Sequence, residues 1–152
     1  MRRILVSSIV ALSLTLGFSI HVAAESSAED AYEYRESIMT ALKGHAGAIS
    51  KQIRGLAGEP AYAAKHARAI ANLGTELHSV FQEGSAVEGS EALPAIWEKP
   101  EEFEAALNKA KEAMAALGDA ADGGDLAQIG NAFMNVGKAC KSCHEDFRLD
   151  DD

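Results

Sequence analysis

The stretch GKACKSCHEDFR, residues 137–148, holds both cysteines of this 152-residue chain. Cys140 and Cys143 stand three residues apart, and His144 follows directly. On a helix these positions share one face. The apolar residues on that face are Leu126, Ile129, Phe133, Val136 and Phe147. The spacing therefore predicts a C-terminal amphipathic helix that carries two thiols and an imidazole toward a core.

Three more segments show apolar residues at helical steps, and the sequence has no strand-like alternation of any length. Their stripes run from Ala31 to Leu56, from His66 to Val80 with Phe81 beside it, and from Phe103 to Leu117. Ser26 with Glu29 predicts a capping box before the first helix, and Asp125 predicts a cap for the last. Glycine and proline separate the segments at 58–60, 84–100 and 122–124. Two short connections and one longer one predict an all-α, antiparallel four-helix bundle.

The N-terminus has the pattern of a secretory signal peptide. Arg2 and Arg3 precede an apolar run over 4–20, and small residues at 22–24 offer a cleavage site after Ala24. A membrane anchor is the alternative, but the run is short for a span and rich in serine and threonine. We therefore expect residues 1–24 to be removed and residues 25–152 to form the exported domain, with no membrane span after cleavage.

The predicted mature chain is strongly acidic. Residues 1–24 carry two arginines and no acidic residue, which leaves 12 basic and 23 acidic residues, a formal net charge of −11. Such a surface disfavours nucleic acid and anionic lipid. It suits a partner with a basic face, or it serves solubility alone.

Cys-x-x-Cys-His is compatible with several kinds of site. A redox dithiol belongs near the start of a helix in a βαβ unit, which this sequence lacks. Zinc needs a fourth ligand, and a disulfide across so small a loop adds little stability. The remaining chemistry is covalent attachment of haem c, in which each cysteine forms a thioether and the histidine binds iron. Export favours this interpretation, because c-type haem is attached outside the cytoplasm.

A signal peptide, four helices and a Cys-x-x-Cys-His motif near the C-terminus together resemble the class II cytochromes c. This family contains the cytochromes c′ and the low-spin cytochromes of the c-556 type. The resemblance covers essentially the whole predicted mature chain. The matching stretches are Tyr34-Arg35 with Met39, Lys43-Gly44-His45 with Gly47, Pro94-Ala95-Ile96-Trp97 with Phe103, and residues 136–148.

The resemblance implies a role for each matching residue. Cys140 and Cys143 would hold one haem c covalently, and His144 would be the proximal iron ligand. Arg148, one turn beyond His144, would lie near the proximal imidazole and the haem edge. Arg35 would lie near a haem propionate, although an exposed helical charge is the alternative.

Met39 separates two functions. In low-spin relatives a methionine here is the sixth iron ligand, and the protein carries single electrons between periplasmic redox proteins. In the cytochromes c′ this position covers the iron without binding it, so that nitric oxide or carbon monoxide can bind. We expect the first function, with His144 and Met39 as axial ligands, and keep the gas-binding cytochrome c′ as the alternative. A helical bundle with an incidental motif is a third, distant reading.

Several further expectations follow. Outside the haem motif we see no nucleophile–base pair, so we do not expect an enzyme. His45, His66 and His78 could supply a second imidazole to the iron, but we interpret them as ordinary helical histidines. Gly44 and Gly47 mark either tolerated weak points of the first helix or a close approach by a helix or the haem. The family often forms homodimers through its first two helices. Small residues that suit such a contact, or that face the core instead, are Ala61, Ala64, Ala67 and Ala71.

Overall fold

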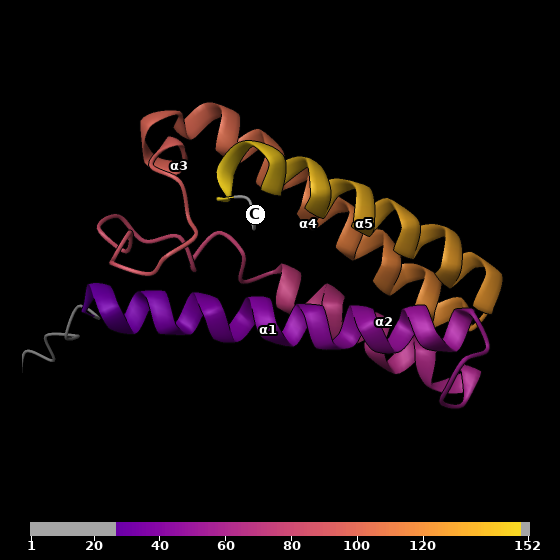
Figure 1. The fold of residues 1–152 in the computed structure, drawn as a ribbon. Coiled ribbons are helices and arrows are strands. Elements are labelled where there is room, and N and C mark those ends of the chain that lie inside the picture. Colours follow the sequence, from indigo (N-terminus) through magenta and orange to yellow (C-terminus); the bar gives the residue numbers. More distant parts are fainter. Residues whose placement is uncertain (1–26, 150–152) are drawn as a thin grey trace, which may run out of the picture.

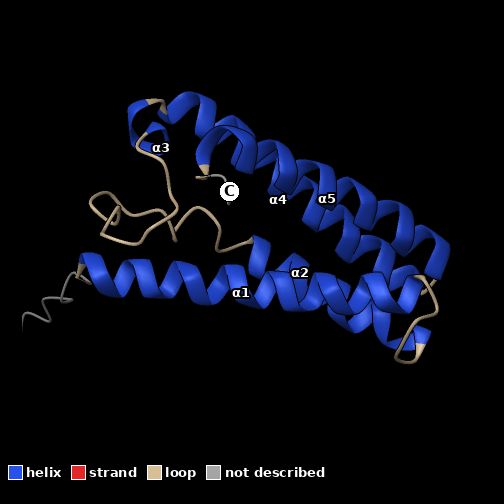
Figure 2. Ribbon diagram, viewed as in Figure 1, coloured by secondary structure: helices blue, strands red, loops and turns tan. Residues whose placement is uncertain are grey.

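The computed structural model describes residues 27–149, and the predicted signal peptide with its cleavage site lies outside this range. The described part folds as helices joined by loops, without a strand (Figure 2). Its elements are α1 (Ala28–Ile53), the 3₁₀ turn η1 (Pro60–Tyr62), α2 (Ala63–Gly74), α3 (Ala95–Glu98), α4 (Pro100–Gly123) and α5 (Leu126–Phe147). The longer helices α1, α2, α4 and α5 run alternately up and down (Figure 1). The predicted antiparallel four-helix bundle is confirmed.

Local chemistry fixes where the helices begin and end. Ser27 and Asp30 form a capping box at the start of α1, one residue later than the predicted pair. The Asp125 carboxylate accepts the N–H groups of Ala127 and Gln128 at 2.7 and 3.2 Å and so caps α5 as predicted. Gly124 ends α4 with φ +72, a left-handed conformation that glycine adopts without a steric penalty.

The second helix is shorter than predicted. It ends at Gly74, and the N–H groups of Thr75 and Glu76 bond to carbonyls three residues back, each at 3.1 Å. Leu77 and Val80 are nevertheless buried. In successive turns with bonds three residues back, side chains three residues apart still point to the same side, as they nearly do in a helix. The apolar spacing was therefore informative there, whereas the helical assignment of 75–81 was wrong.

The core lies where α2, α4 and α5 meet. Leu117 and Ala67 are completely buried in it. At Gly118 an added Cβ would come within 2.8 Å of the Ala71 Cβ, so α2 and α4 approach closely at this point. Ala67 and Ala71 therefore serve the core rather than an outer face. Gly44 and Gly47 have open space around them, so no neighbouring helix of the described chain explains them.

The connection between α2 and α4, residues 75–99, closes the wide end of the bundle (Figure 1). The Leu93 N–H donates to the Phe147 carbonyl at 3.0 Å, and the Leu149 N–H donates to the Glu91 carbonyl at 2.8 Å. These bonds tie the connection to the last turn of α5, in the same segment as the cysteine motif. None of the helices within 27–149 combines the length and apolarity that a membrane span requires.

Candidate functional site

A cavity of about 560 Å³ opens at the wide end of the bundle. All six predicted site residues line it: Arg35 and Met39 from α1, Cys140, Cys143 and His144 from α5, and Arg148 directly after α5. Residues far apart in the sequence thus meet at one place. Apolar side chains supply much of the remaining wall, among them Ile70, Leu77, Phe81, Phe103 and Leu107.

The two thiols are half-buried on the inner side of α5 and are not joined in a disulfide. Burial raises the pKa of Cys140. Burial, together with Cys140 and Asp146, raises the pKa of Cys143 to about 11. Both thiols therefore stay protonated near neutral pH, in contrast to the low-pKa thiolate of a redox-active dithiol.

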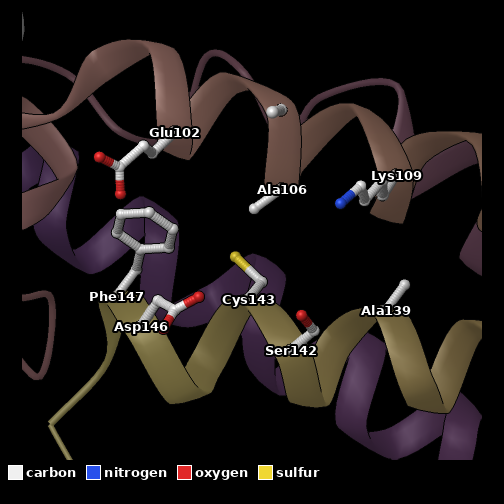
Figure 3. Close-up of a pocket in the computed structure, with 9 residues that line it drawn as sticks. Glu102, Ala106, Lys109, Ala139, Ser142, Cys143, Asp146 and Phe147 are labelled. Carbon is white, nitrogen blue, oxygen red and sulfur yellow. The ribbon is translucent and has the colours of Figure 1, made fainter.

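Cys143 also borders a second, smaller space. This cavity of about 120 Å³ lies between α4 and α5 and is lined by Ala106, Ser142 and Asp146. Figure 3 shows the Cys143 sulfur directed toward Ala106 of α4. Cys143 thus lies in the wall between the two cavities.

His144 is exposed, but its ring is surrounded closely enough that burial lowers its pKa. The Arg148 charge lowers this pKa further, while Glu91 acts in the opposite direction. Arg148 Nε lies 2.9 Å from Glu91 Oε2, so the two charges are paired beside the imidazole. A neutral imidazole is the form that binds metal. Glu91 also lines the cavity, and sequence reasoning missed it because the connection carries no periodic signal.

Arg35 is not the exposed helical charge of the alternative interpretation: it is only 2% exposed. Its guanidinium donates to Ser85 Oγ at 2.6 Å, to the Ser85 carbonyl at 2.8 Å and to Ser90 Oγ at 3.0 Å. Within 27–149 it forms no ion pair with a carboxylate, and burial lowers its pKa. A buried cation held only by neutral acceptors favours an anion nearby. The serines of the connection were not singled out from the sequence.

The residues present fit a haem. The cavity volume falls within the range of about 300–1,000 Å³ that is usual for bound cofactors. Two thiols and an imidazole lie on one wall, apolar side chains face the space between, and Arg35 offers a buried positive charge for a propionate. Zinc fits less well, because no group of three or more His, Cys, Asp or Glu in the described residues could hold a metal ion.

Comparison with known proteins gives the same assignment. The family model of cytochrome c′ matches residues 30–148. Cytochrome c′ of Pararhodospirillum photometricum is 42% identical over 76% of this chain and 94% of its own. Cytochrome c-554 of Cereibacter sphaeroides is 40% identical over 91% of this chain and 97% of its own. A solved structure of ferrous cytochrome c′ from Alcaligenes xylosoxidans with bound nitric oxide has a TM-score of 0.75 at 29% identity, covering 84% of this chain and 99% of that one.

These comparisons correct one prediction. The expected low-spin electron carrier, with Met39 as the sixth iron ligand, is contradicted by relatives named cytochrome c′ and by related structures with bound nitric oxide or carbon monoxide. The physical reason is that a methionine on the iron would occupy the position that a gas needs. The findings favour the alternative function. They also confirm haem c as the cofactor, and the chain belongs to the cytochrome c′ family.

Proposed function

We propose that this protein binds nitric oxide or carbon monoxide at a five-coordinate haem c. The observation that carries the proposal is the similarity to proteins named cytochrome c′, for which solved structures hold bound nitric oxide or carbon monoxide. The cavity wall supports it: His144 is the only histidine of the described chain that lines it, and α1 contributes Met39, Leu42 and Ala46 to the wall. No second imidazole is therefore in place to saturate the iron. When bound, the haem supplies an iron atom with one coordination position for a diatomic gas.

Each residue of α5 has a defined task in this proposal. Cys140 and Cys143 would hold the haem through thioethers, which would remove both thiols from redox chemistry. His144 would bind iron through its neutral imidazole, a form favoured by the burial of the ring and by the Arg148 charge. Arg148, paired with Glu91, holds a positive charge beside the proximal imidazole.

The α1 residues shape the opposite side. Met39 is half-buried and lines the cavity with Leu42 and Ala46. These side chains would keep the space that a gas enters narrow and apolar, which disfavours water relative to a small uncharged gas. Arg35 would hold a propionate, while its hydrogen bonds to Ser85 tie the connection to α1.

The cellular setting is part of the proposal. We place the protein in the periplasm, where a redox partner would reduce the iron before carbon monoxide binds. The acidic surface suits a partner with a basic face. Its role is binding, as in sensing, storage or detoxification, rather than catalysis. A homodimer through α1 and α2 would use the exposed Ala61 of η1, since Ala64 and Ala67 pack in or against the core.

An optical experiment tests the proposal. The protein is matured in a host that attaches haem c, and its ferrous spectrum is recorded with and without carbon monoxide. A broad high-spin spectrum that shifts with carbon monoxide is expected, in the wild type and in Met39→Leu alike. A sharp, split spectrum unchanged by carbon monoxide would overturn it. Cys140→Ala and Cys143→Ala should each lose one thioether by mass spectrometry of haem peptides, whereas His144→Ala should lose the proximal ligand but keep both thioethers.

A further inference from the structure

Two histidines that do not line the haem cavity face each other across α1 and α2. His45 Nδ1 and His66 Nδ1 are 2.9 Å apart, and the ring centroids are 5.2 Å apart with the rings tilted by 49°. Both side chains are half-buried, so water reaches them. The distance suits an N–H···N hydrogen bond, in which one ring donates and the other accepts. The two Nδ1 atoms, each able to bind a metal ion when it carries no proton, therefore lie next to each other.

Along the chain, the residues one helical turn from each histidine carry no charge and no carboxylate, thiol or imidazole. Residues one helical turn from His45 are alanine, leucine and isoleucine, at 41, 42, 48 and 49. Those one turn from His66 are alanine, isoleucine and Tyr62, at 62, 63, 69 and 70. Lys65, next to His66 in sequence, lies over the Tyr62 ring with Nζ 4.6 Å from its centroid. The two imidazoles therefore face each other among mostly apolar neighbours along the chain.

We propose that His45 and His66 form a binding site for a divalent transition-metal ion, with water in the remaining positions. Two nitrogens bound at about 2.0–2.1 Å and at a right angle are about 2.9 Å apart, whereas tetrahedral bonding would separate them by about 3.3 Å. The observed 2.9 Å equals the separation of cis positions on a tetragonal ion, and because the rings, with centroids 5.2 Å apart, now point at each other, each ring turns to aim its lone pair at the ion. Imidazole ligands in that geometry select copper(II) or nickel(II) over zinc.

Binding needs a rotation of both side chains but no change in the backbone. The proton between the two Nδ1 atoms moves through solvent to a free Nε2, and the metal lies beside the line that joins these atoms, within about 2.0–2.1 Å of each. The net negative charge of the chain, −9 over the full sequence, favours a cation. Because the two ligands are 21 residues apart on different helices, a bound ion would join α1 to α2 and stabilise the folded chain.

The test uses the mature holoprotein with its haem. Copper(II) and, separately, nickel(II) are titrated by calorimetry into the wild type, His45→Gln, His66→Gln and His78→Gln. His78 is the matched control, because it is an exposed histidine paired with Glu104 at 3.1 Å, away from the α1–α2 pair. Copper(II) bound to the wild type is also examined by electron paramagnetic resonance, which counts its nitrogen ligands without a variant. The haem absorption spectrum is followed throughout.

The expected result is one ion per chain, two nitrogen ligands and an unchanged haem spectrum. His45→Gln and His66→Gln should each bind about 10- to 100-fold more weakly, since each removes one arm of a chelate, while His78→Gln should bind as the wild type does. Equal binding by all four proteins, or loss in only one of the paired variants, would overturn the proposal. A copper signal with only one nitrogen ligand would also overturn the proposal. Because this measurement uses the wild type alone, it holds even if a variant does not fold.

Discussion

The most informative perturbation of this structure is Arg35→Met, which keeps the apolar stem and removes the buried charge. Arg35 makes four hydrogen bonds: two to Ser85 and one to Ser90 at 2.6–3.0 Å, and a longer one of 3.4 Å to the Val80 carbonyl. Each bond from a charged donor contributes about 1.5–3 kcal/mol. Removing the cation also relieves a desolvation cost of several kcal/mol. The Ser85 hydroxyl keeps its bond to the Gln82 carbonyl at 2.7 Å, but the Ser85 carbonyl, on a fully buried residue, loses this donor.

These terms leave a net loss of about 3 kcal/mol in the free energy of unfolding, and loss of the propionate contact proposed for Arg35 would add to it in the holoprotein. The assay is urea denaturation of the holoprotein, followed by the helical circular dichroism signal, with Arg54→Met as the control. Arg54 is an exposed arginine at the end of the same helix, so its replacement should change stability by less than about 0.5 kcal/mol. An Arg35→Met protein as stable as Arg54→Met would refute the argument.

The same substitution should change gas binding. Ser85 and Ser90 belong to the connection that also brings Phe81, Glu91 and Ala92 to the cavity wall. Without its anchor the connection opens more often, so carbon monoxide should associate faster with Arg35→Met than with Arg54→Met. Stopped-flow mixing of the ferrous proteins measures this rate. Equal rates in the two variants would contradict the idea that Arg35 limits access to the haem.

Three further predictions follow from packing and protonation. Gly118→Ala should lower the free energy of unfolding by about 1–3 kcal/mol, because the new Cβ would meet the Ala71 Cβ at 2.8 Å. Gly44→Ala has open space around the new Cβ and should raise the free energy of unfolding by about 0.5–1 kcal/mol. Urea denaturation that changes in the same direction for both variants would contradict this. Leu117→Ala, at a fully buried position, should cost about 3 kcal/mol by the same assay, and a cost under about 1 kcal/mol would show that the core collapses around the gap. In the haem-free chain the pKa of Cys143 is raised to about 11, so the folded state holds its proton more tightly than the unfolded state does. The resulting stability is present below about pH 8.5 and is lost as pH rises toward 11. Alkylation of Cys143 should accelerate over that upper range, and a midpoint near pH 8.5 would show that the thiol is not buried.

Much of the architecture follows from the sequence, because helical periodicity and caps are local signals. Asp125 and Gly124 act at the positions predicted for them, and the apolar face of α5 leads directly to Cys140 and Cys143. The meeting of six site residues at one cavity was anticipated through family resemblance rather than through periodicity. Leu56 was misplaced: α1 ends at Ile53, and Leu56 is 60% exposed.

What could not be predicted depends on contacts between distant residues. Ser85, Ser90 and Glu91 lie in an irregular connection, so no periodic pattern marks them, yet they hold Arg35 and Arg148. The sequence also could not predict whether the iron has a sixth ligand, since a methionine at position 39 is compatible with both functions. Only the relatives distinguished them.

The bonds between the connection and the end of α5 have a consequence for how the protein is made. The Leu93 N–H and the Glu91 carbonyl pair with Phe147 and Leu149, directly beside the cysteine motif. The connection can therefore close only after the last turn of α5 has formed. Because closure covers the motif on one side, we expect haem to be attached to the exported chain before these bonds form. Closure of the connection would then mark the end of maturation.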